Sequence, residues 1–110
     1  MASKRMAPAE RTEQILLAAI RVAEVKGYSK INRLMVVEEL KGEVTDGLVS
    51  RYFGQRAQLR EAVLKEGMAR GNLTIIAQAL ALGVRAARKL EQAAQIPPDT
   101  VQSWKEFLGA

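Results

Sequence analysis

Residues 44–60, VTDGLVSRYFGQRAQLR, decide the fold expected for this 110-residue chain. Thr45 is a favoured residue for capping the N-terminus of a helix, and the apolar positions after it recur at helical spacing as far as the aromatic pair 52–53. Gly54 then ends the helix, and a second amphipathic segment begins at about Arg56. The stretch therefore predicts two helices separated by a sharp turn.

The segment before this stretch is expected to form another short helix, over residues 30–40, because its apolar side chains recur at helical spacing. They are Ile31, Leu34, Val37 and Leu40. Residues 41–43 are expected to form a turn, and Val44 an apolar plug between the two helices. Two short helices joined by a tight turn with glycine are typical of the helix-turn-helix, which lays its second helix in the major groove of DNA.

The N-terminal part of the chain is expected to hold an arm and a long helix. Residues 1–9 read as a flexible basic arm carrying Lys4 and Arg5, which either has no role or contacts DNA. A broad apolar stripe then predicts a helix that ends at Gly27, where glycine suits a helix C-terminus. Tyr28 is expected to pack back onto the core. This helix is interpreted as scaffold.

The C-terminal part also reads as helical. Apolar spacing predicts one helix that ends near Gly71 and another over residues 73–87, despite Gly83. The prolines at 97–98 break the chain and suit the start of a last helix, through residues 101–108. Strand-like alternation of apolar and polar residues is absent from the sequence. We therefore expect an all-α fold of about six helices.

The charge of the chain is unevenly distributed. Its formal net charge is +5 and its pI about 9.9. Residues 1–60 contain 11 Lys and Arg against 7 Asp and Glu, whereas residues 61–110 contain 6 against 5. The positive excess thus lies with the predicted helix-turn-helix, as phosphate binding requires. A solvated basic surface on an ordinary protein would give the same count, so charge by itself leaves both readings open.

Composition excludes several classes of function. The sequence contains neither cysteine nor histidine, so a disulfide framework, a zinc site of the usual kind and histidine acid–base chemistry are excluded. Carboxylates such as Glu38 and Glu39 have no nucleophile or metal-ligand constellation beside them, so an enzyme is the least favoured class and no cofactor or metal is expected. No apolar run has the length of a membrane span, and we expect a cytoplasmic protein without a membrane partner.

The first 65 residues resemble the DNA-binding head of TetR-family regulators. The motifs that carry the resemblance are ILLAAIRVAEVKGY (15–28), the spaced apolar residues of 34–40, VTDGLVSRYF (44–53) and GQRAQLREAVL (54–64). Their order and distances are jointly specific. The resemblance implies a three-helix helix-turn-helix head over residues 10–65, with its third helix in the major groove. It also implies a helical dimerisation region of about three helices over residues 66–110.

Three features depart from the family pattern. The turn at 41–43 is longer than the single residue that is usual, and Asp46 and Ser50 stand where a basic or neutral residue and a tyrosine are common. Only residues 65–110 follow the head, where the family usually adds a larger ligand-binding domain. Because so short a segment can hardly enclose a drug-sized pocket of ~300 Å³ or more, a small-molecule ligand is not expected.

Five residues are expected to contact DNA phosphates. The resemblance assigns this role to Thr45 at the start of the recognition helix, to the hydroxyl of Tyr52, and to Arg56, whose cation adds to a helix N-terminus. Lys30 and Arg33 at the start of the second helix are plausible clamps on the DNA backbone. The structural alternatives are a helix cap for Thr45, a core position for Tyr52 and surface charge for the basic residues.

The outward residues of the recognition helix are the candidates for reading bases. Ser50 and Arg51 lead, because arginine can bind the O6 and N7 atoms of guanine with two hydrogen bonds. The alternative for Arg51 is a contact with phosphate or with a neighbouring carboxylate. Gly47 would permit close approach to the groove, or is a small residue near a helix start. Asp46 could accept a hydrogen bond from cytosine N4, or point away from DNA as a capping partner.

The second half holds more apolar surface than three short helices need internally. The residues expected at a homodimer interface are Leu80, Val84, Trp104, Phe107 and Leu108. A dimer would place two recognition helices about one DNA turn, ~34 Å, apart. The alternative is a monomer whose last helix closes a single core.

The leading expectation is a sequence-specific regulator of transcription that binds double-stranded DNA as a dimeric repressor on a palindromic operator, without a small-molecule switch. Two alternatives stay open. One is a viral DNA-packaging recognition subunit of the small-terminase kind, in which the helical region forms a ring. The other is a helical adaptor that uses its apolar face to bind a protein.

Overall fold

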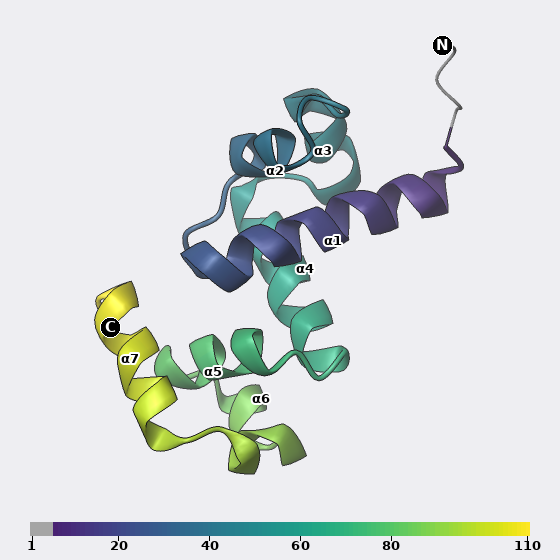
Figure 1. The fold of residues 1–110 in the computed structure, drawn as a ribbon. Helices are drawn as coiled ribbons and strands as arrows, with labels where there is room; N and C mark the ends of the chain where they lie inside the picture. The colour runs from purple at the N-terminus through teal and green to yellow at the C-terminus, as the bar shows by residue number, and fades with distance from the viewer. Residues whose placement is uncertain (1–5) are drawn as a thin grey trace.

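The computed structural model describes residues 6–110, which form helices and no β-strand (Figure 1). The elements are α1 (Pro8–Lys26), α2 (Arg33–Glu39), α3 (Asp46–Phe53), α4 (Arg56–Ala69), α5 (Leu73–Ala81), α6 (Arg85–Arg88), the 3₁₀ helix η1 (Glu91–Gln95) and α7 (Pro98–Leu108). The prediction of an all-α fold is confirmed. Lys4 and Arg5 of the expected arm lie outside the described residues, and α1 already begins within the range 1–9. No helix of the described part has both the length and the apolar character needed to cross a bilayer.

Helices α1, α2 and α3 form a three-helix unit at one end of the molecule, against which the first part of α4 packs (Figure 1). α1 contacts α2 and α4, and α3 contacts the same two helices. The side chains at the centre of this unit are 0% exposed, namely Ile15, Ala19, Val36, Val49 and Leu59. Burying one such Val, Leu or Ile side chain contributes about 1.5–3 kcal/mol. This cluster therefore determines which face of each helix turns inward.

Helix α4 leads from this unit to a second group of helices, α5 to α7 (Figure 1). α5 is central in that group, since it contacts α4, α6, η1 and α7, and its residues 75–79 are all buried. α4 and α5 approach closely at Gly67, where a Cβ atom would lie 2.5 Å from Cγ2 of Ile75. A larger residue at this position would push the two helices apart.

The end of α1 ties the two groups of helices together through Gln78 of α5, which is 0% exposed. The backbone N–H of Tyr28 donates to Oε1 of Gln78 (2.8 Å), and Nε2 of Gln78 donates to the carbonyl of Ala23 (2.9 Å). Leu108 of α7 lies against the same point, because a Cβ atom on Gly27 would be 2.5 Å from its Cδ2. Tyr28 is buried as expected. The helix end is thus held by both α5 and α7.

The second helix is shorter than the expected range 30–40. It begins at Arg33 because Asn32 caps it, with its side chain accepting a hydrogen bond from the N–H of Met35 (2.9 Å). Lys30 consequently lies in the turn that precedes the helix. Leu34, which was expected on the inner face, is 59% exposed. The prediction from apolar spacing was therefore wrong about the start of the helix and about Leu34, which it placed on the inner face.

The helix expected over residues 73–87 is divided in two. α5 ends at Ala81, Gly83 takes a left-handed backbone conformation (φ +76°), and α6 follows as a single turn. The N–H groups of Gly83 and Val84 bond back to the carbonyls of Leu80 and Ala79, at 3.1 and 2.9 Å. Glycine adopts positive φ at little cost, so it ends a helix readily. The expectation of one continuous helix was wrong for this reason.

Candidate nucleic-acid interface

Helix α3 is short and amphipathic. Thr45 caps it, with Oγ1 accepting a hydrogen bond from the N–H of Leu48 (3.0 Å), and Gly54 ends it with a positive φ of 74°. Val49 is fully buried on its inner side, and Leu48, Tyr52 and Phe53 pack partly buried against the same core. Its other side is occupied by Asp46, Gly47, Ser50 and Arg51, of which all but the half-buried Ser50 are exposed. The residues expected to read bases therefore share the outer side of α3.

Among the residues that the structure describes, no packing contact requires glycine at position 47. A Cβ atom added there would meet only Oγ1 of Thr45, at the ordinary contact distance of 3.9 Å, and Gly47 does not have positive φ. Glycine inside a helix is less favourable than alanine by about 0.8–1.0 kcal/mol. Gly47 thus lowers the stability of α3, and no contact among residues 6–110 compensates for this loss.

The connection between α2 and α3 is longer than in a usual helix-turn-helix. It comprises residues 40–45, whereas the typical turn has about three or four residues. Lys41 and Gly42 both have positive φ (53° and 81°), and the N–H of Gly42 bonds to the carbonyl of Val37 (3.1 Å). Val44 is 2% exposed and fills the space between the helices, as expected. The extra residues are therefore used to close α2 before the chain enters α3.

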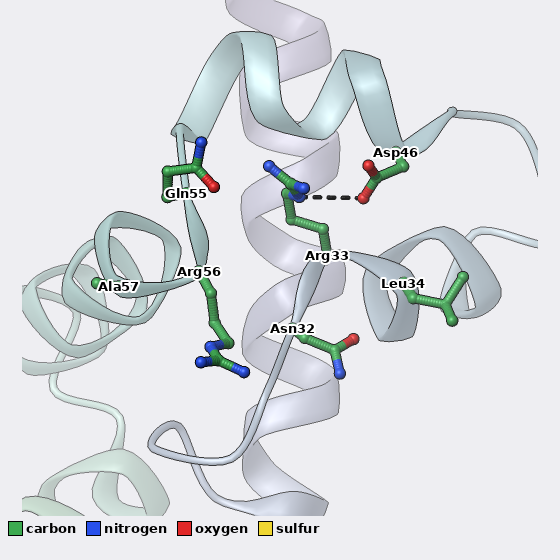
Figure 2. Close-up of a pocket in the computed structure, with 7 residues that line it drawn as sticks. All are labelled: Asn32, Arg33, Leu34, Asp46, Gln55, Arg56 and Ala57. Carbon is green, nitrogen blue, oxygen red and sulfur yellow. Dashed lines mark hydrogen bonds and ion pairs between the residues drawn. The ribbon is translucent and has the colours of Figure 1, made fainter.

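An open groove of about 520 Å³ lies where the first turns of α2, α3 and α4 meet (Figure 2). It is lined by Asn32, Arg33, Leu34, Asp46, Gln55, Arg56 and Ala57. Figure 2 shows the guanidinium of Arg33 between Asp46 and Gln55, alongside α3, and that of Arg56 on the side of Asn32. Two of the residues expected to contact phosphate, Arg33 and Arg56, thus belong to one groove.

Arg33 and Asp46 form an ion pair across this groove. Nε of Arg33 donates to Oδ1 of Asp46 at 3.0 Å, and the side chains are 26% and 55% exposed. The carboxylate that was expected to accept from a cytosine is therefore bound to arginine in the free chain. Asp46 also stands in the first turn of α3, where the helix dipole favours negative charge. No sequence pattern links the two residues, because they belong to different helices.

Arg60 of α4 adds a third cation that sequence reasoning missed. Its Nε donates to the carbonyl of Ile31 (2.8 Å), so it fastens α4 to the segment before α2. Burial and, secondly, repulsion from Arg56 lower the pKa of Arg60. It stays a cation, because arginine titrates far above neutral pH. Arg60 lines a separate hollow together with Ala57 and Glu61, so the cations of the groove lining itself are Arg33 and Arg56.

The remaining expected phosphate contacts lie apart from the groove lining. Lys30 is exposed in the turn before α2, and Thr45 is exposed at the start of α3. The ring of Tyr52 is half-buried and packs against the core. Thr45 has the capping role that was its structural alternative, and Tyr52 contributes to packing. Both positions leave part of the side chain accessible.

The five residues expected at a dimer interface do not form one surface. Leu108 is buried in the chain's own core, and Leu80 and Val84 are half-buried against that core. Trp104 and Phe107 of α7 instead form an edge-to-face pair, with ring centroids 5.5 Å apart, and Phe107 is 64% exposed. For Leu108 the structure supports the alternative reading, in which the last helix closes the core.

A second apolar hollow lies beside this aromatic pair. It has a volume of about 230 Å³ and is lined by Leu73, Thr74, Gln95, Ile96, Pro97, Thr100 and Trp104. Leu73, at the start of α5, is 46% exposed. The apolar surface left on the C-terminal half therefore involves α5, the 96–97 loop and α7. The sequence analysis expected the interface on the 73–87 segment, through Leu80 and Val84, and on the last helix, and it did not include Leu73 or the 96–97 loop.

Comparison of the chain with protein-family models, curated proteins and solved structures gave no match.

Proposed function

We propose that this chain binds duplex DNA in a sequence-specific manner and regulates transcription, with α3 as the recognition helix. One observation carries the proposal. The outer side of α3 presents the small residues Gly47 and Ser50 beside Arg51, and cationic side chains flank both ends of the helix. Arg33 is bound to its first residue, and Arg56 begins α4 directly after it. A short, open helix face beside a groove with two cations matches a helix that enters the major groove next to a phosphate backbone.

Arg51 is the residue assigned to direct base reading. It is exposed and, within residues 6–110, takes part in no ion pair. Its guanidinium is therefore free to bind guanine, and a good two-bond contact of this type discriminates between bases by about 1–3 kcal/mol. Ser50 and Gly47 would set how closely the helix approaches the bases. Asp46, because it is bound to Arg33, is not retained as a base reader.

The proposal includes a dimer. The exposed ring of Phe107, beside Trp104 and Leu73, would contact a second copy of the chain. A two-fold dimer would bind a palindromic site through two α3 helices. Occupying that site would repress transcription by excluding the polymerase. The proposal contains neither a small-molecule inducer nor a catalytic activity.

Selection of bound sites from a pool of random duplexes tests the proposed function. We expect enrichment of a short palindrome and, in a mobility-shift assay, tighter binding to it than to unrelated duplexes at moderate salt. Equal binding to all duplexes would refute sequence-specific recognition. Light scattering tests the assembly, since a ring of many copies would instead indicate a DNA-packaging subunit. A protein partner captured equally well after nuclease treatment would favour an adaptor.

A further inference from the structure

We propose that Asp46 is a positioning residue, which holds Arg33 so that the outer edge of its guanidinium binds a phosphate of the DNA backbone. This inference rests on the proposed function, because it assigns the groove between α2, α3 and α4 to the sugar–phosphate strand beside the recognition helix. The ligand chemistry is a phosphodiester. The assignment changes Asp46 from a reader of bases into a residue that acts through Arg33.

Among residues 6–110, the ion pair leaves the outer edge of the Arg33 guanidinium without a bonding partner. An arginine has five N–H donors, one on Nε and four on the two Nη atoms. The hydrogen bond from Arg33 to Asp46 uses Nε alone. Arg70 shows the contrasting arrangement, because both of its Nη atoms bind Glu13 and its Nε binds Glu66. Acidic side chains thus occupy both edges of Arg70, whereas Asp46 occupies one edge of Arg33.

The free edge belongs to the groove. Arg33 lines it together with Arg56, and Figure 2 shows the two guanidinium groups at separate places along it. Counting Arg33, Asp46 and Arg56, the charged groups that line the groove sum to +1. Gln55 and Asn32 add amide groups that can hydrogen-bond to a phosphate or sugar. The groove can therefore receive a strand of DNA backbone even though it contains a carboxylate.

Holding the side chain in advance favours binding. A free arginine loses rotamer freedom when it binds phosphate, and an ordered guanidinium loses less of it. Arg33 is already ordered by its bond to Asp46 and by partial burial, with 26% of its side chain exposed. The carboxylate therefore has two opposite effects on DNA affinity: it repels the nearby phosphates, and it orients the cation that attracts them.

These opposite effects make the sign of one substitution decisive. If Asp46 only repels DNA, Asp46→Asn would strengthen binding, because it removes a negative charge. If Asp46 positions Arg33, the same substitution would weaken binding despite the gain in net positive charge. The salt slope is the slope of the logarithm of the binding constant against the logarithm of the salt concentration, and each phosphate contact contributes about 0.9 to it. If affinities are equal at 1 M salt, the loss of one contact therefore weakens binding about eightfold at 0.1 M salt.

The experiment measures binding of the full chain to a labelled random-sequence duplex by fluorescence anisotropy, over a series of salt concentrations. A random duplex suffices because phosphate contacts do not depend on sequence. We expect Arg33→Ala to weaken binding about eightfold and to lower the salt slope by about 0.9. Asp46→Asn should also weaken binding, but by less, because it removes a charge that repels phosphate. The double variant should be no weaker than Arg33→Ala, because both substitutions remove the same contact. Asp46→Glu, which keeps a carboxylate, should restore part of the affinity.

Glu39→Gln is the matched control. It removes an ion pair of the same type, from Nε of Arg21 to Oε2 of Glu39 at 2.9 Å, outside the groove. We expect it to leave affinity and salt slope unchanged. Circular dichroism establishes that each variant is helical at the temperature of the titration. If Asp46→Asn weakens binding no more than Glu39→Gln does, the positioning role is overturned.

The outcomes separate this inference from the proposed function. If the unaltered chain binds the duplex and Asp46→Asn binds equally well or more tightly, only the positioning role fails. If the unaltered chain binds no duplex at all, the proposed function and the inference both fail. A last arm replaces the duplex with inorganic phosphate. Saturable binding of that ion, without duplex binding, would overturn the assignment of the groove to DNA.

Discussion

Replacing Gln78 should destabilise the whole molecule, because its side chain joins the end of α1 to α5. In Gln78→Ala the N–H of Tyr28 loses its partner, Oε1 at 2.8 Å, in a fully buried position. Leaving a buried donor without a partner costs about 1–3 kcal/mol. The carbonyl of Ala23 is affected less, since it still accepts from the N–H of Gly27 at 2.8 Å.

The lost packing adds to this cost. Gln78→Ala removes one methylene group, Cγ, from the core as well as the amide, and a buried methylene contributes about 0.8 kcal/mol. Together with the unpaired N–H, we expect a loss of about 3 kcal/mol in the free energy of unfolding. Since urea lowers the stability of small proteins by about 1–3 kcal/mol per molar, the urea concentration at the unfolding midpoint should fall by roughly 1–3 M.

Urea titration followed by two signals checks the prediction. Circular dichroism reports all helices, and the fluorescence of Trp104, the only tryptophan in the sequence, reports α7. Gln78→Met separates the two contributions, because methionine fills the space but lacks the strong acceptor, and it should lose about 1–3 kcal/mol. Gln102→Ala, at an exposed position on α7, is the control and should stay within about 0.5 kcal/mol of the unaltered chain. A Gln78→Ala variant as stable as that control would refute the reasoning.

Other measurements address the interface, the dimer and an exposed ion pair. Gly47→Ala should raise the free energy of unfolding by roughly 0.5–1 kcal/mol. It should also weaken DNA binding, since the added methyl group would lie on the outer side of α3. Stronger DNA binding would contradict the assignment of this side of α3 to DNA. Arg51→Ala should relax the preference at one base pair of the selected site by about 1–3 kcal/mol, and an unchanged preference would remove Arg51 from base reading. Phe107→Ser should shift the mass measured by light scattering towards that of the monomer without loss of helix. An unchanged dimer would show that the α7 surface is not the dimer interface. Arg70→Ala should raise the pKa of Glu13, because the hydrogen bonds with Arg70 hold that pKa below its ordinary value. The stability that these bonds add is lost as the pH falls through the lowered pKa. An unchanged pKa of Glu13 in an NMR titration would contradict the pairing.

Local signals were sufficient where a helix has both a strong apolar stripe and clear ends. α1 has a proline in its first turn and Gly27 after its last residue, and α3 has Thr45 and Gly54. α7 begins at a proline as well. Caps and stripes act within a few residues of each other, so they can be read directly from the chain. The expected ends of these helices agree with the structure to within a residue or two.

Local signals were insufficient where two readings competed. Asn32 is a favoured capping residue, but the apolar spacing of residues 30–40 suggested an earlier start for α2. Gly83 could have been tolerated within a helix, and the structure shows that it ends one. The candidate site was predicted in part. The outer residues of α3 share one side as expected, whereas the partner of Asp46 and the contribution of Arg60 were not foreseen.

The sequence by itself determined the all-helical class, the bounds of most helices and the position of the positive charge, because periodicity, caps and composition are local properties. Only the tertiary structure decided that Asp46 binds Arg33, that Gln78 is buried at the end of α1, and that Leu108 belongs to the chain's own core. Each of these contacts joins residues of different helices. Such contacts depend on how the helices pack, and packing is set by the sum of many weak apolar contacts rather than by any motif.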